Sequence, residues 1–78
     1  MFEDRELSEK VSSIGLTVYR MFDESLVVAR KHATDDEFKE YRLAVGHVLA
    51  EVLERVMNPI WQRHPDLCPD ELNQEKNL

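Results

Sequence analysis

Residues 38–61 constrain the fold most, because their apolar side chains recur with helical spacing and occupy two sides of one helix. The first seam consists of Phe38, Tyr41, Val45, Val48 and Val52. The second seam is displaced around the helix and consists of Leu49, Leu53, Val56, Met57 and Ile60. One partner helix covers only one such stripe. The pattern therefore predicts a helix that is covered on two sides.

Residues 3–33 are predicted to form another long helix. Its apolar stripe alternates spacings of four and three residues, and no proline interrupts it. The stripe runs through Leu7, Val11, Ile14, Val18, Met21, Ser25, Val28 and His32, and Phe22 widens it. Two amphipathic helices joined by a short turn favour an antiparallel hairpin. The predicted fold class is therefore all-α.

The turn between the two helices is predicted at residues 33–34, although neither glycine nor proline marks it. Thr34 and Glu37 have the spacing of a capping box, in which each side chain accepts from the other residue's backbone N–H. Basic residues at 30–32 suit a helix C-terminus, and acidic residues at 35–37 suit the next N-terminus. The alternative is one continuous helix, in which Lys31 and Asp35 form an i,i+4 pair. Because two capping features coincide at Thr34, we favour the hairpin.

Prolines are predicted to shape the end of the second helix. Pro59 lacks a backbone donor and its ring clashes one turn back, so a helix over residues 35–64 should be kinked near 58–59. His64 precedes Pro65 and should end that helix. We expect a turn at 66–69, a single helical turn at 70–72 and a frayed polar tail at 73–78. Residues 1–72 would then form one helical domain.

The length and the cysteine content limit how the chain can be stabilised. A chain of 78 residues allows one domain, and a core of this size is marginal without staples or association. Cys68 is the single cysteine, so an intrachain disulfide cannot form. The first residues lack a signal-peptide pattern, and no apolar run reaches the roughly 18 residues of a membrane span. We therefore expect a cytoplasmic protein without a membrane partner.

The charge distribution argues against a nucleic-acid partner. The net charge is −6, and the ten Lys and Arg residues are scattered along the chain. Affinity for phosphate backbones comes mainly from a concentrated cationic surface. A well-solvated acidic surface is the favoured interpretation, ahead of a role in which acidic residues recognise a basic partner.

No motif in the sequence predicts a reaction. His64 and Cys68 are four residues apart, but Pro65 interrupts the helix and two ligands are too few for a zinc site. The Glu-x-x-His pattern of di-metal bundles and glycine-rich phosphate loops are both missing. Cys68 is expected in a proline-flanked turn as an ordinary thiol. We expect no catalytic residue, no cofactor and no metal site.

Each predicted long helix contains one glycine, at a cost of about 0.5–1 kcal/mol relative to alanine. Folding the hairpin at Thr34 places Gly15 near Leu53 and Gly46 near Met21 or Phe22. Both glycines are predicted to make room for a large side chain across the helix interface.

A polar strip on the second helix is the candidate contact surface for a partner protein. Its residues are Glu40, His47, Glu51 and Glu54, and Trp61 follows them on the helical wheel. Tryptophan is common among interface hot spots, so Trp61 is a candidate anchor. The alternative is a solvated helix edge, with Glu51 and Arg55 as an i,i+4 pair and Trp61 as a lid over the core.

Two hairpins that pair into a dimeric four-helix bundle would cover both seams, since one surface is then used twice about a two-fold axis. The core and dimer residues we predict are Val11, Ile14, Val18, Met21, Phe22, Val45, Val48, Leu49, Val52 and Val56. The expected function is that of a homodimer that binds another protein as a regulator, adaptor or accessory subunit. The alternatives are an immunity or antitoxin-like protein that neutralises a basic partner and, less favoured, an enzyme with a site at the dimer interface.

Overall fold

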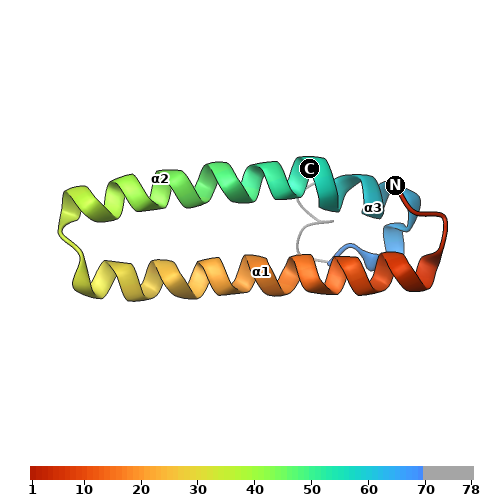
Figure 1. The fold of residues 1–78 in the computed structure, drawn as a ribbon, viewed down its shortest axis with the longest axis horizontal. Helices are drawn as coiled ribbons and strands as arrows, with labels where there is room; N and C mark the ends of the chain where they lie inside the picture. Colours follow the sequence, from red (N-terminus) through yellow and green to blue (C-terminus); the bar gives the residue numbers. More distant parts are fainter. Residues whose placement is uncertain (70–78) are drawn as a thin grey trace.

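The computed structural model describes residues 1–69, and over this range the chain forms an antiparallel helical hairpin without strands. Helix α1 spans Arg5–His32 and helix α2 spans Asp35–Val52. A single wide turn of π-helix, η1, covers Leu53–Met57 and leads into helix α3 at Asn58–Arg63. A 3₁₀ turn, η2, covers Pro65–Leu67. The predicted all-α hairpin is confirmed (Figure 1).

Helix α1 is the longest element, and its ends are set by local hydrogen bonds. It has 28 residues, so it is about 42 Å long at 1.5 Å per residue. The side chain of Asp4 accepts a hydrogen bond of 3.2 Å from the N–H of Leu7 and caps the first turn. Arg30, Lys31 and His32 occupy the last turn, where positive charge complements the helix dipole. The predicted range of 3–33 is shortened by these caps at both ends.

A capping box closes the turn between α1 and α2, as the sequence predicts. Thr34 Oγ1 accepts from the Glu37 N–H at 3.2 Å, and Glu37 Oε1 accepts from the Thr34 N–H at 2.8 Å. The bond from the Thr34 N–H, with a smaller contribution from the Thr34 hydroxyl, lowers the pKa of the Glu37 carboxyl because it favours the charged form. The alternative of one continuous helix is therefore wrong.

The second helix differs from the prediction of one kinked helix over residues 35–64. The regular α-helix ends at Val52, about two turns before Pro59. In η1 the N–H of Asn58 donates to the carbonyl of Leu53, five residues back. Pro59 has no N–H to offer, and its ring needs room beside the carbonyl of Arg55, so the helix widens before the proline is reached. His64 leaves the helical region before Pro65, as predicted.

The main core lies at one end of the hairpin, which we call the closed end (residues 2–16 and 53–68). Its buried side chains are Met57, Ile60, Trp61 and Cys68. Phe2, Val11 and Leu16 pack against this cluster from the N-terminal side. Figure 1 shows the start of the chain, α3 and the segment after it gathered at this end. The closed end therefore has side chains from several segments around one centre.

Polar contacts also join the segments of the closed end. Arg5 pairs with Asp66, and Arg63 pairs with Glu3 at 3.0 Å. His64 Nε2 hydrogen-bonds with the carbonyl of Phe2 at 3.1 Å. The Arg5 partner lowers the pKa of the Asp66 carboxyl, and Asp66 in turn raises the pKa of Arg5. These bonds hold residues 2–5 against residues 63–66.

The rest of the hairpin, which we call the turn half (residues 17–52), has only two helices. Its buried apolar residues are Val45 and Leu49. One polar bridge crosses it, because the hydroxyls of Ser25 and Tyr41 lie 2.7 Å apart. The expectations for residues 70–72 and 73–78 lie outside the described part of the chain.

The two helical glycines have different surroundings. A Cβ placed at Gly15 would overlap the sulfur of Met57, so this glycine makes room for a large side chain, although the neighbour is Met57 and not Leu53. A Cβ placed at Gly46 would meet nothing within 4 Å. The expectation for Gly46 beside Met21 or Phe22 is wrong, since it is exposed on α2.

Candidate functional site

A line of exposed apolar side chains runs along α1. Leu7, Ile14, Met21 and Val28 are 43%, 64%, 62% and 58% exposed, respectively. They are seven residues apart, close to two helical turns, so they lie along one side of the helix. This regular spacing distinguishes the line from apolar residues scattered over a surface.

An apolar groove lies beside this line, between α1 and α2. Near the middle of the hairpin it is lined by Val18, Met21, Phe22, Ser25 and Tyr41. Toward the turn it continues past Val28 and Ala29 to Ala33 and Glu37, with Ser25 and Tyr41 shared by both parts.

Val48 extends the same surface along α2, because it lies two turns after Tyr41 and is 46% exposed. We call this surface the apolar face. Its residues are Leu7, Ile14, Val18, Met21, Phe22, Val28, Tyr41 and Val48.

The ten residues predicted for the core and dimer contact divide into three groups. Val45 and Leu49 are buried between the helices. The half-buried residues are Val11, Val18, Phe22, Val52 and Val56. Ile14, Met21 and Val48 are exposed. The first group meets the expectation of a core, and the third lies on the apolar face, where this chain alone does not cover it.

The residues predicted to face a partner are also placed differently from one another. Glu40, His47, Glu51 and Glu54 are exposed, and Glu51 pairs with Arg55. Trp61 is only 2% exposed, and its Nε1–H donates to Ser12 Oγ at 3.0 Å. The prediction that Trp61 faces a partner is wrong, because the wide turn at Leu53–Met57 changes the phase of the helix and directs Trp61 toward α1.

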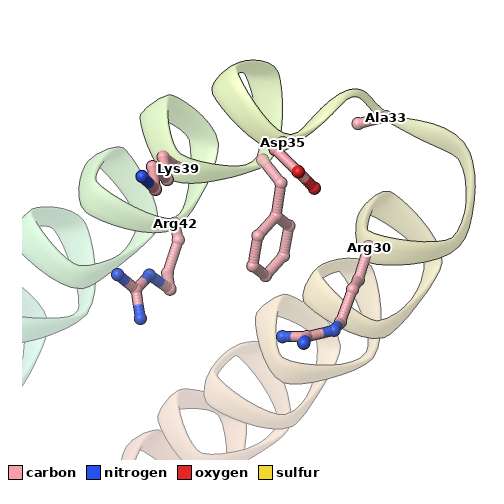
Figure 2. A pocket seen from close by; sticks show the side chains of 6 residues that line it. Arg30, Ala33, Asp35, Lys39 and Arg42 are labelled. Atoms are coloured by element: carbon pink, nitrogen blue, oxygen red, sulfur yellow. The ribbon is translucent and has the colours of Figure 1, made fainter.

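A second depression lies on the other side of the hairpin, near the turn. It is lined by Arg30, Ala33, Asp35, Phe38, Lys39 and Arg42. Figure 2 shows Arg30 reaching in from α1, with Lys39 and Arg42 on α2 and Asp35 above them. The guanidinium carbon of Arg30 lies 5.5 Å from the centre of the Phe38 ring, which is the geometry of a cation–π contact. We call this depression the cationic cup.

No sequence feature predicted the cationic cup. Arg30 and Arg42 are twelve positions apart, and neither belongs to a motif. The only available signal was that the hairpin turn at Thr34 brings residues just before it close to residues just after it. Scattered basic residues along the chain thus become neighbours once the turn is placed.

Neither a cluster of metal ligands nor a membrane-spanning helix occurs among the described residues. Within residues 1–69, no group of three or more His, Cys, Asp or Glu side chains is arranged to hold a metal ion. Cys68 lies directly after the 3₁₀ turn at Pro65–Leu67, so the expected turn is present, and its side chain is buried in the closed end. Among the helices described, none combines the length and the apolar character needed to cross a bilayer.

Comparisons with protein-family models, curated proteins and solved structures found no match for this chain. The apolar face, the polar strip and the cationic cup are the candidate functional surfaces of the described chain.

Proposed function

We propose that this chain is a homodimer that acts by binding another protein, as a regulator, adaptor or accessory subunit. Two hairpins pair through their apolar faces and form a four-helix bundle. The observation that carries the proposal is the line of exposed apolar residues at seven-residue spacing on α1, next to a groove that opens toward the same side.

The spacing of this line is that of residues at helix–helix contacts. In a bundle, residues that recur every seven positions insert between those of a facing helix. A two-fold axis lets the same surface serve both chains, so Met21 of one hairpin can fill the groove beside Tyr41 of the other. No new surface is needed to complete such a bundle.

The small number of buried side chains in the turn half also supports association. Two helices alone bury few side chains there, and Met21 and Val28 remain more than half exposed. Removing apolar surface from water contributes about 25 cal/mol per Å², so covering these side chains favours the dimer. The closed end already has its own core and gains less from a partner.

The polar strip of α2 would remain available in such a dimer. Val45 faces α1, and His47, two positions later, points to nearly the opposite side of the helix. Glu40, Glu51 and Glu54 share that exposed side. We propose that a second protein docks here.

The alternative is an immunity or antitoxin-like role, in which this acidic strip neutralises a basic protein. The carboxylates of the strip are exposed, and the chain carries a net charge of −6. This role predicts a tight complex whose rate of association falls steeply with salt.

The homodimer can be tested by light scattering during size exclusion across a dilution series. We expect a mass of twice the 9.2 kDa of one chain. Ile14→Asp and Val48→Asp each place a charge in the apolar face. Each should raise the dissociation constant of the dimer at least tenfold and so convert the dimer to monomer. Val27→Asp and Leu43→Asp are matched controls, because these residues are 58% and 61% exposed but lie outside the apolar face.

The controls should remain dimeric. A wild-type chain that is monomeric at every concentration would overturn the proposed homodimer, and so would equal weakening by control and test substitutions. A monomer that binds a hydrophobic dye would instead assign the apolar face to a different protein.

A further inference from the structure

We propose that the cationic cup binds an oxyanion, either a carboxylate or a phosphate, that is carried on an apolar or aromatic group. The juxtaposition behind this proposal is a guanidinium from α1 held over an aromatic ring from α2, with two more cations from α2 at the rim.

The Arg30–Phe38 contact prepares an arginine for binding. A guanidinium that lies over a ring uses its flat face for the contact, and its N–H groups point outward in the plane. Those N–H groups form a fork that matches two oxygens of a carboxylate or phosphate. The ring therefore limits the movement of Arg30 without using its hydrogen-bond donors.

The charges around the cup are not balanced by the protein. Arg30, Lys39 and Arg42 form no ion pair with any residue of the described chain. Asp35 is the only carboxylate in the lining, so the lining carries three positive charges against one negative charge. This local excess occurs in a chain of net charge −6. A bound oxyanion would reduce the repulsion among the three cations.

The ring also indicates what the oxyanion is attached to. Phe38 is half-buried, so part of its surface stays open beside the guanidinium. An apolar or aromatic group next to the oxyanion would cover this surface. A bare inorganic anion would leave the ring wet and should bind more weakly.

The cationic cup does not depend on the proposed dimer. Arg30 lies two positions after Val28, and Lys39 lies two positions before Tyr41, so each pair points to nearly opposite sides of its helix. The apolar face and the cationic cup are consequently on opposite sides of the hairpin. Anion binding can be present or absent whichever oligomeric state is found.

Nuclear magnetic resonance titration of the full chain at low salt tests the proposal. The probes are phenyl phosphate, a blocked Glu-Phe-Glu tripeptide, inorganic phosphate and benzyl alcohol. Phenyl phosphate or the tripeptide should shift the amides around residues 30–42, at least threefold more tightly than inorganic phosphate. Benzyl alcohol, which has no charge, should cause no saturable shift. Tighter phenyl phosphate points to a phosphorylated ligand, and tighter tripeptide points to an acidic protein segment.

Substitutions in the cationic cup test whether the anion binds there. Arg30→Gln and Arg42→Gln should each weaken binding roughly fivefold or more, because each removes charge-assisted hydrogen bonds. Arg20→Gln is the matched control on the exposed surface of α1 and should leave affinity unchanged. Phe38→Leu should reduce the preference for phenyl phosphate over inorganic phosphate. An equal loss of affinity in Arg20→Gln would overturn the proposal, and so would the absence of a saturable shift with both phenyl phosphate and the tripeptide.

Discussion

The two ends of this hairpin are built from the same pair of helices but are held together differently. At the closed end, Trp61 and Ile60 are surrounded by α1, the residues before α1 and the segment after α3. In the turn half, α1 and α2 meet alone, and their contact is fixed by the capping box at Thr34 and the Ser25–Tyr41 bridge. Two helices alone bury only Val45 and Leu49 among the apolar side chains of the turn half, whereas the added segments of the closed end enclose a whole cluster.

This difference also separates where stability and where binding are expected. A side chain that its own chain encloses contributes to the core and cannot reach a partner. The exposed residues of the apolar face contribute little to the isolated hairpin, but they are available for association. Regions with few buried contacts open more readily, so amide exchange should be faster in the turn half than at the closed end.

The largest effect is expected when the core of the closed end is removed. Trp61→Ala should lower the free energy of unfolding by about 3–5 kcal/mol, since it leaves a cavity and removes the donor to Ser12. Phe38→Ala, an aromatic truncation in the turn half, should cost only about 1–2 kcal/mol because Phe38 is half-buried. Urea denaturation followed by circular dichroism measures both. Equal losses would contradict the division into two differently held regions.

Replacing the two glycines by alanine should change the free energy of unfolding by a smaller amount, with opposite signs in the two regions. Gly46→Ala should stabilise the chain by about 0.5–1 kcal/mol, because helix propensity improves and no atom lies within 4 Å of the new Cβ. Gly15→Ala should destabilise it by about 1–2 kcal/mol, because the buried Met57 must move. The same urea experiment provides the test. Stabilisation by both substitutions would mean that Met57 moves aside freely.

The smallest effect concerns the pH dependence of the capping box. The pKa of Glu37 is lowered from its ordinary value of 4.5, so its stabilising contribution is present above pH 4.5 and is lost as the pH falls through the folded value. Glu37→Ala should therefore lower the urea midpoint at pH 7 by more than it does at pH 3. If the substitution lowers the urea midpoint by the same amount at both pH values, the carboxylate charge is unimportant for the cap.

Local sequence signals predicted the hairpin well. Thr34 and Glu37 are three residues apart and form their bonds without help from the rest of the fold, so the turn could be placed without glycine or proline. The end of the helix at His64 was predictable for the same reason, because Pro65 restricts its immediate neighbour. Both features depend on residues within one helical turn.

Predictions that required the path of the whole chain were less successful. The helical wheel assumed a constant 100° per residue up to Trp61, and the wide turn at Leu53–Met57 breaks that assumption. Trp61 was therefore assigned to the partner surface although it is buried. Gly46 was assigned a large neighbour because the hairpin was assumed to pack evenly along its length. The cationic cup was missed because it depends on contacts between two helices.

The wide turn has a consequence for the tolerance of this chain to insertions and deletions. An α-helix that gains or loses one residue rotates everything beyond that point by about 100°. Leu53–Met57 already accommodates one residue more per turn than the helices on either side. Deletion of a single exposed residue there would restore regular winding and leave Trp61 directed toward Ser12, so this short segment tolerates the loss of one residue better than the regular turns of α1 do.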